Sequence, residues 1–233
     1  MRVFFDDCFE AEKQYALYPI SSLKSVGDEP LVMRHWMMSE KEYQDIEVTV
    51  HRKGGRLYTS SSLYELSHKL PKWYPFFKDV TFKTEFVNND DNDIRAWLST
   101  HPYFSVFIKD HIKSLTTSTG SVAHDINQFV KVIEEMRYYG VEGNFCFREF
   151  VDIIPDTEHR HFMFNGSMIS DSHDVSEEIM SLVRKFPAKF FSFDTVYDIA
   201  GRHWLVEVGD GQVSSTTLSE DKTKDLYQAL SPY

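Results

Sequence analysis

The last third of the chain alternates apolar and polar residues with the period of two that is typical of β-strands. The run GRHWLVEVGDGQVS, from Gly201 to Ser214, predicts one strand, and the aromatic run KFFSFDTVYD before it predicts another. The segment from Asp198 to Gly201 predicts the turn that folds these two strands together. Because successive side chains of a strand point to opposite faces, we expect Glu207 to share a face with His203 and Leu205.

Three earlier segments carry strand patterns of their own. The apolar run SVFIK ends at Lys109, and the run GNFCFREFV contains the adjacent charged residues Arg148 and Glu149. The run EHRHFMFNGSMIS places Arg160 on the same face as two phenylalanines. Asn165-Gly166, one of the strongest short signals for a two-residue turn, predicts a hairpin at the end of that strand.

Other segments have the apolar spacing and the capping residues of helices, and we expect helices at 39–45, 62–69, 121–139 and 176–185. The stretch EVTVHRKGGRLYTS predicts a hairpin that turns at Lys53-Gly54-Gly55. In the run MRHWM we expect a buried Trp36 beside a surface Arg34. Helices and strands interspersed in this way predict the α+β class.

Carboxylates gather near the C-terminal end of the predicted sheet. Pairing of the last two strands would bring Asp194 close to Glu207, and Asp210 follows just beyond Gly209. A buried carboxylate needs a cation, and a hard divalent ion such as Mg2+ takes oxygen ligands that it shares with phosphates. Two other interpretations stay open: Asp194 caps a turn, and Glu207 forms an ion pair with an arginine.

Basic side chains stand about 90 residues earlier. Lys109, at a strand end, is placed to project its ammonium toward phosphate oxygens, and Lys113 follows four residues later. The stretch TTSTGS after it predicts a polar loop without the spacing of a P-loop. Arg160 needs an anionic partner. The alternatives are an ordinary solvated Lys109 and an ion pair of Arg160 with Glu149 or Glu158.

Composition narrows the classes of protein. The net charge of −11 disfavours a broad grip on nucleic acid, and the two cysteines form no framework for disulfides or metal. We find no apolar run long enough to span a bilayer, and acidic residues interrupt the N-terminal segment where a signal peptide would be apolar. We therefore expect a soluble, cytoplasmic protein that does not span a membrane and for which nucleic acid is a disfavoured partner.

The order of these elements resembles the ATP-grasp superfamily, in particular its small clade with arginines on the central strands. The resemblance covers roughly 104–218 and rests on the lysine strand, the REFV strand, the arginine hairpin, the FD strand and VEVGDGQ. It implies two α+β subdomains that clasp ATP. We expect a reduced N-terminal region over 1–100, a nucleotide-covering subdomain over 101–152 and a metal-binding subdomain over 153–233.

The resemblance also implies roles for single residues. Lys109 and Arg160 would be catalytic and contact the phosphates, and the other expected contacts to ATP are Lys113, Arg148, Glu149, Phe150 and Val151, of which the last three form the hinge at the adenine. Asp194 and Glu207 would bind Mg2+. The superfamily pattern ends in Glu-x-Asn, which this chain lacks. We therefore predict Asp210 as the third metal ligand, with Gln212 as the alternative.

The implied reaction is an ATP- and Mg2+-dependent ligation, in which a carboxylate is activated as an acyl phosphate and joined to an amine or similar nucleophile. Either substrate could be carried by a peptide or protein. The first alternative is a non-catalytic ATP-binding assembly factor, because the chain is also similar to the cell-division-cycle 123 family. The second is a nucleotidyltransferase or nucleic-acid ligase, which the absence of a KxDG signature after Lys109 makes the weaker choice.

Overall fold

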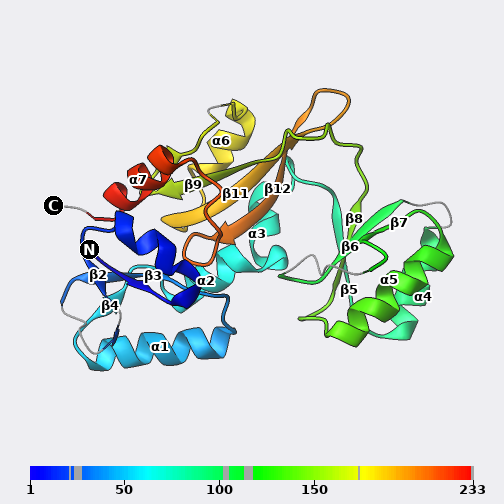
Figure 1. Ribbon diagram of the computed structural model, residues 1–233. Coiled ribbons are helices and arrows are strands. Elements are labelled where there is room, and N and C mark those ends of the chain that lie inside the picture. The colour runs from blue at the N-terminus through cyan, green and yellow to red at the C-terminus, as the bar shows by residue number, and fades with distance from the viewer. Residues whose placement is uncertain (21, 24–27, 102–104, 113–117, 173, 232–233) are drawn as a thin grey trace.

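The computed structural model describes residues 1–20, 22–23, 28–101, 105–112, 118–172 and 174–231. Three four-stranded sheets organise this part of the chain. Figure 1 shows the N-terminal sheet and the middle sheet at opposite ends, with the C-terminal sheet between and above them. The mixture of helices and strands confirms the α+β class.

The N-terminal sheet is parallel and has the order β2-β1-β3-β4. Its strands are β1 (Arg2–Phe5), β2 (Pro19–Ile20), β3 (Pro30–Arg34) and β4 (Arg56–Leu57). The helical elements of this region are η1 (Asp7–Tyr15), α1 (Glu40–Arg52) and α2 (Ser61–His68).

The hairpin that we expected around Gly54 is wrong, because EVTV forms the second half of helix α1. A reciprocal capping box between Ser39 and Glu42 starts this helix and satisfies two backbone N–H groups. Tyr43 and Val50, seven residues apart, are its buried residues, which is the spacing of a helix rather than of a strand. Gly54, with φ +82°, then turns the chain into β4.

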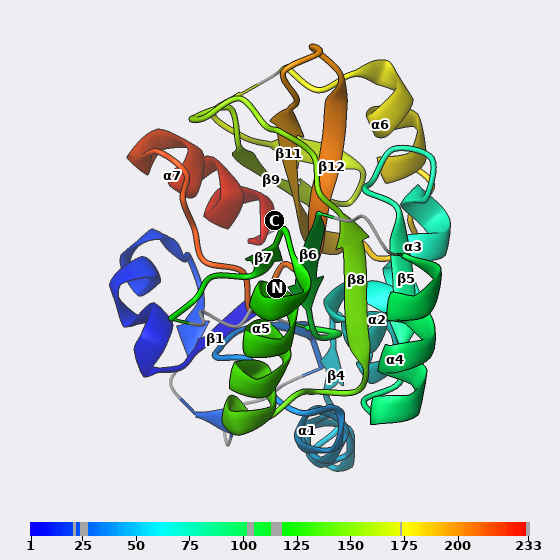
Figure 2. The same cartoon turned by 90° about the vertical axis from the view of Figure 1, so that its right-hand side faces the viewer.

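The middle sheet is antiparallel, with the order β5-β8-β6-β7. It consists of β5 (Thr84–Val87), β6 (Val106–Lys109), β7 (Val122–Ala123) and β8 (Phe145–Glu149). Two helices, α4 (Asp91–Thr100) and α5 (Ile126–Tyr139), cover its outer face, as Figures 1 and 2 show, and share one apolar core with it. Lys109 and Arg148 therefore stand on the opposite, inner face.

The C-terminal sheet, β10-β9-β11-β12, is also antiparallel. Its strands are β9 (His159–Phe164), β10 (Ser167–Ile169), β11 (Phe190–Tyr197) and β12 (His203–Asp210). The expected turn is confirmed, since Asn165 and Gly166 both adopt positive φ angles between β9 and β10. One face packs on α3 (Leu70–Phe77) and α6 (Glu177–Val183), and the other on the N-terminal sheet and α7 (Glu220–Ala229).

A β-bulge in β12 decides where Glu207 points. Asp194 pairs with Glu207 and Thr195 with Leu205, so Val206 has no Cα partner on β11. The extra residue reverses the alternation, and Leu205 and Val208 pack into the same core. Our expectation that Leu205 and Glu207 share a face is therefore wrong: Glu207 lies on the opposite face, beside Asp194.

The other expected helices are confirmed as α2, α5 and α6, with boundaries that differ by a few residues. Ser60, Asp125 and Ser176 accept backbone hydrogen bonds as their N-caps, and Gly140 with φ +91° ends α5. Within the described residues, every helix is too short or too polar to cross a membrane.

Candidate functional site

Lys109 and Glu207 meet across the space between the middle and C-terminal sheets. Lys109 is the last residue of β6, and its Nζ lies 2.8 Å from Oε1 of Glu207 on β12. The lysine side chain is 2% exposed, whereas that of Glu207 is 37% exposed. A cation from the middle of the chain thus faces a carboxylate near its end, and the carboxylate remains open to solvent on one side.

Arg160 and Asp194 form a second ion pair on neighbouring strands of the C-terminal sheet. They are Cα partners in the pairing of β9 with β11. The guanidinium holds both carboxylate oxygens, with Nε 2.8 Å from Oδ1 and Nη2 2.7 Å from Oδ2. The bonds to Asp194 raise the pKa of Arg160, and burial raises the pKa of Asp194. Such a fork orients both groups as well as pairing their charges.

The two ion pairs are neighbours, because Asp194 is also the Cα partner of Glu207. Burial raises the pKa of Glu207, but the nearby charges of Lys109, Arg148 and Arg160 outweigh it and leave that pKa below its usual value. Glu207 is therefore ionised at neutral pH. The two carboxylates thus lie side by side, with Lys109 bonded to Glu207 and Arg160 bonded to Asp194.

Arg148 fixes the middle sheet to the bulge. Its Nη1 donates to the carbonyl of Val206 at 3.0 Å, and its Nη2 donates to Oγ1 of Thr81 at 2.9 Å. The guanidinium also lies over the ring of Phe82, 5.1 Å from the centroid. Because Val206 lacks a partner on β11, Arg148 stabilises the irregular backbone that turns Glu207 toward Lys109. Burial lowers the pKa of Arg148 to about 10.

The expected hinge residues lie at the end of β8, where the chain leaves the middle sheet. Glu149 forms two hydrogen bonds with Lys83, each of 2.8 Å: its backbone N–H donates to the Lys83 carbonyl, and its side chain accepts from the Lys83 N–H. The backbone N–H of Phe150 donates to the carbonyl of Ser105 at 3.4 Å, and its ring is partly exposed. Val151 lies in the connection between β8 and β9. Their contact with adenine stays a prediction.

A pocket of about 330 Å³ opens over the carboxylates. Its walls come from the C-terminal sheet, from the segment after β12, from the segment after β6 and from the N-terminal region; the lining residues are Met37, His68, Ile112, Arg160, Ser192, Asp194, Glu207, Val208, Gly209, Val213, Ser214 and Ser215. Two further pockets, of about 560 and 260 Å³, share His68 and Ile112 with it. A cleft therefore leads from the ion pairs to the surface between α1, α2 and residues 139–143.

The structure does not bring Asp210 to Asp194 and Glu207. The Asp210 side chain is buried and accepts hydrogen bonds at Oδ1 from the backbone and side-chain nitrogens of Gln212, at 2.9 and 3.1 Å. Burial raises the pKa of this carboxyl to about 7. Among the described residues no three side chains of His, Cys, Asp or Glu gather as a metal-binding group. A third metal ligand at Asp210 or Gln212 stays a prediction.

Lys113 and the first two residues of the TTSTGS loop lie outside the described residues. The expectation for the run MRHWM is wrong, because Arg34 is fully buried and Trp36 is 60% exposed. Arg34 is the last residue of β3, and the central residues of this strand are all buried. Its position at the end of an apolar parallel strand was the sequence signal that could have predicted its burial. His68 and Ile112, which line every part of the cleft, carry no comparable signal in the sequence.

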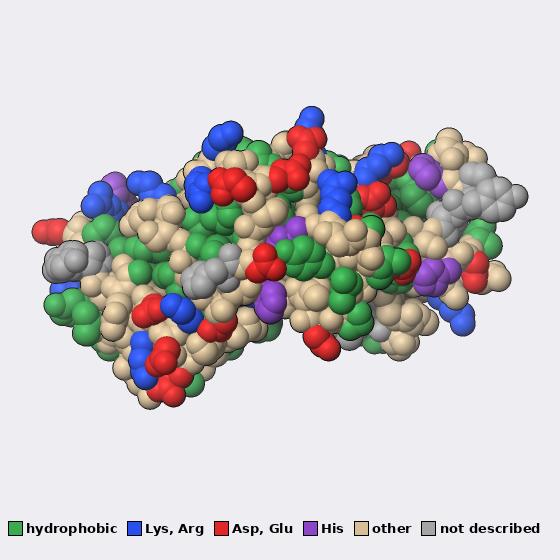
Figure 3. All heavy atoms as spheres, turned by 90° about the horizontal axis from the view of Figure 1, so that it is seen from above, with side chains coloured by type: hydrophobic (Ala, Val, Ile, Leu, Met, Phe, Trp, Pro, Cys, Tyr) green, Lys and Arg blue, Asp and Glu red, His purple; other side chains and the backbone are tan. Residues whose placement is uncertain are grey.

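On the face shown in Figure 3, acidic and basic side chains are interspersed and the basic ones form no broad patch. Lys109, Arg148 and Arg160 are buried or half-buried around Glu207. Three cationic side chains thus lie together at the site, where they suit a small anionic ligand.

Residues 73–230 match the family model described as ATP-grasp domain, R2K clade family 3. The chain belongs to this family. A search of curated proteins finds no match to the sequence. ATP-grasp proteins generally use ATP and Mg2+, so membership implies that this chain binds ATP.

Solved structures confirm the ATP-grasp fold over nearly the whole chain. The D-cycloserine synthetase DcsG shares 14% identity with a TM-score of 0.69, and the match covers 98% of each chain. A RimK domain ATP-grasp protein from Sphaerobacter thermophilus shares 11% identity with a TM-score of 0.69 and the same coverage. The ATP-grasp ligase PsnB, solved with a precursor peptide and AMPPNP, shares 12% identity with a TM-score of 0.62, covering 98% of this chain and 95% of PsnB.

Proposed function

We propose that this protein is an ATP- and Mg2+-dependent ligase that activates a carboxylate as an acyl phosphate and joins it to an amine or a similar nucleophile. The observation that carries the proposal is the pairing of Lys109 with Glu207 and of Arg160 with Asp194 around one open pocket. The two cations complement the negative charge of a triphosphate, and the two carboxylates complement the positive charge of its metal ion.

The donor set suits Mg2+. Asp194 and Glu207 offer carboxylate oxygens on adjacent strands, and Mg2+ is commonly held by one or two carboxylates together with substrate phosphates and water. When bound, Mg2+ would neutralise charge on the phosphate oxygens. Lys109 and Arg160 would then leave the carboxylates and contact the phosphates, so that each ion pair is exchanged for a contact with the ligand.

The residues of the chain act by positioning and charge. An oxygen of the acyl donor attacks the γ-phosphorus, ADP leaves, and the incoming nucleophile then displaces phosphate from the acyl carbon. Lys109 and Arg160 would hold the phosphates in line for this transfer. Arg148 would keep the bulge of β12 in place, so that Glu207 stays beside Asp194.

The length of the cleft favours a substrate larger than a free amino acid. It extends from the ion pairs past His68 toward the surface beside α1 and α2, in three adjoining pockets. One structural neighbour with a TM-score above 0.6 was solved with a precursor peptide. We include a peptide or protein among the proposed carriers of the acyl group or of the nucleophile.

The test is turnover of ATP. The chain is incubated with ATP, Mg2+ and a panel of carboxylic acids and acidic peptides, with hydroxylamine as a small nucleophile, and ADP and hydroxamates are measured. Formation of ADP that depends on a carboxylic acid of the panel, and that is lost in Lys109→Met, supports the ligase. Binding of one nucleotide per chain without ADP formation across the panel would instead favour the assembly factor, and an AMP–protein adduct would revive the nucleotidyltransferase.

A further inference from the structure

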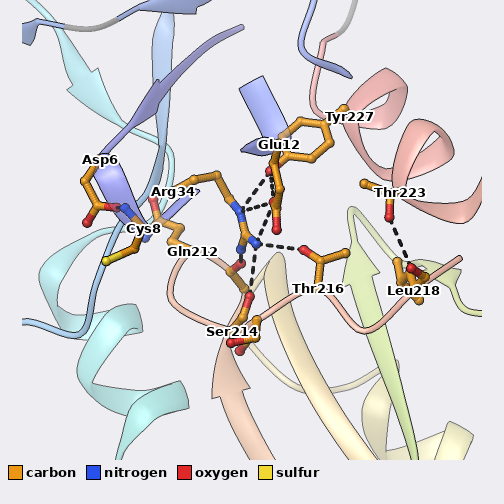
Figure 4. Close-up of polar contacts among 12 residues, drawn as sticks. Asp6, Cys8, Glu12, Arg34, Gln212, Ser214, Thr216, Leu218, Thr223 and Tyr227 are labelled. Carbon is orange, nitrogen blue, oxygen red and sulfur yellow. Dashed lines mark hydrogen bonds and ion pairs between the residues drawn. The ribbon is translucent and has the colours of Figure 1, made fainter. Parts of the chain in front are cut away.

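Arg34 is the most extensively bonded of the buried charged groups outside the pocket. It is 0% exposed, although it ends a strand of the N-terminal sheet. On one side its guanidinium contacts Glu12 at 3.0 Å and the hydroxyl of Tyr227 at 3.1 Å. Its Cζ also lies 4.2 Å from the centroid of the Phe9 ring. These contacts tie together η1, β3 and α7, as Figure 4 shows for the residues that it labels.

The other side of the guanidinium holds the segment 211–216, which follows β12. Nη1 donates to the carbonyl of Gly211, and Nη2 donates to the carbonyl of Ser214 at 3.0 Å and to Oγ1 of Thr216 at 2.9 Å. Buried carbonyl groups need donors, and the planar fork of an arginine can serve several at fixed angles. Arg34 thus fixes the path of this segment at three points.

The backbone of β3 holds the same segment. The N–H groups of Met33 and His35 donate to the side-chain and backbone oxygens of Gln212, at 2.9 and 3.1 Å. Gln212 is therefore bonded to the residues that lie on both sides of Arg34 in the chain. The position of the segment is set by these contacts together with hydrogen bonds to the C-terminal sheet, from Gly211 to Phe190 and from Ser214 to Asp210.

This segment forms one wall of the pocket and contacts one of the site's cations, Arg160. Val213, Ser214 and Ser215 line the pocket, and the carbonyl of Ser215 accepts a hydrogen bond from Nη1 of Arg160 at 3.3 Å. Ser214 Oγ lies 2.6 Å from Ser192 Oγ, another lining group. A chain of contacts therefore runs from Arg34 through the segment to the arginine that pairs with Asp194.

We propose that Arg34 is a positioning residue for the nucleotide site: it holds the segment 211–216 so that Arg160 and the pocket wall keep the geometry that the phosphates require. This role rests on the proposed function. It makes the N-terminal region a part of the site even though it supplies neither a proposed metal ligand nor a proposed phosphate contact.

The first test measures binding of Mg2+·AMP-PNP by calorimetry in the wild type, Arg34→Lys and Tyr227→Phe. Lysine keeps the charge but cannot reproduce the fork, so we expect affinity to fall at least tenfold. Tyr227→Phe removes a contact on the side away from the segment and should leave affinity within twofold, although it also lowers the thermal midpoint. A folded Arg34→Lys variant with affinity within twofold of the wild type would overturn the proposal.

Hydrogen exchange provides the second test, and it does not depend on nucleotide. Amides of residues 213–216 should exchange at least tenfold faster in Arg34→Lys, while amides of α6 are unchanged. If Arg34→Lys does not fold, Thr216→Val removes one of the three contacts and should accelerate the same amides. Equal exchange in the folded variant and the wild type would overturn the proposal. If the wild type binds no nucleotide, the proposed function is refuted. Hydrogen exchange of residues 213–216 then still tests whether Arg34 orders the segment.

Discussion

Lys109→Met should make the chain bind a free divalent cation more tightly, not less. In the nucleotide-free chain the Lys109 ammonium occupies the Glu207 carboxylate at 2.8 Å, so a metal ion must displace it. Removing the ammonium frees one of the two proposed ligands. The same substitution should weaken ATP more than adenosine, because a phosphate contact is lost.

The size of the effect follows from the geometry. A hydrogen bond between charged groups contributes about 1.5–3 kcal/mol when it is sheltered. Glu207 is 37% exposed, so solvent screens part of this, and we take about 1–2 kcal/mol for the displaced contact. That difference corresponds to a roughly 5- to 30-fold gain in affinity for the free metal.

Mn2+ is a suitable probe, since the loss of the free-ion signal in electron paramagnetic resonance reports binding directly. Wild type, Lys109→Met and Lys131→Met are titrated without nucleotide. Lys131 is an exposed lysine of α5 and controls for the change in net charge. An affinity for Mn2+ in Lys109→Met equal to or weaker than that of Lys131→Met would refute the ion-pair exchange.

Three further outcomes follow from the same site. Glu207→Gln should abolish the gain in AMP-PNP affinity that Mg2+ provides while leaving the circular dichroism spectrum unchanged; a retained Mg2+ dependence speaks against this ligand. Gly209→Ala would place a Cβ 2.8 Å from Ser214 Oγ and 3.0 Å from Ser192 Oγ, so urea unfolding should show a loss of about 1–3 kcal/mol, and an unchanged midpoint contradicts the tight approach. Asp210→Asn should stabilise the chain at pH 8: burial raises the folded pKa to about 7 from 3.8, so the wild type loses stability as pH rises between these values. A variant whose stability keeps the pH slope of the wild type excludes Asp210 as its source, and a lost Mg2+ dependence in that variant would favour Asp210 as the third ligand.

Much of the C-terminal sheet could be predicted from the sequence, because its signals are local. The turns at Asn165-Gly166 and after Asp198 each fix a short stretch of backbone. The charged residues within the apolar strands marked the candidate site. The turn after Asp198 predicted that Asp194 lies close to Glu207, whereas their direct pairing depends on the bulge at Val206. Contact between Lys109 and Glu207 is not local, and only the resemblance to ATP-grasp proteins suggested it.

The failures have physical causes. Period-two alternation assigned Glu207 to the face of Leu205, and the bulge at Val206 moved it, since a single extra residue exchanges the two faces. The EVTV stretch has strand-forming residues, but the capping box at Ser39 and the burial of Tyr43 and Val50 favour a helix. The role of Arg34 depends on a segment almost 180 positions away, which no local pattern reports.

The most direct measurement is a crystal structure of the chain with Mg2+ and AMP-PNP. We expect the metal about 2.0–2.1 Å from oxygens of Asp194 and Glu207 and from phosphate oxygens. Lys109 and Arg160 should have left those carboxylates for the phosphates. A nucleotide bound elsewhere, or one bound in this pocket with the Lys109–Glu207 pair intact, would contradict the proposed site.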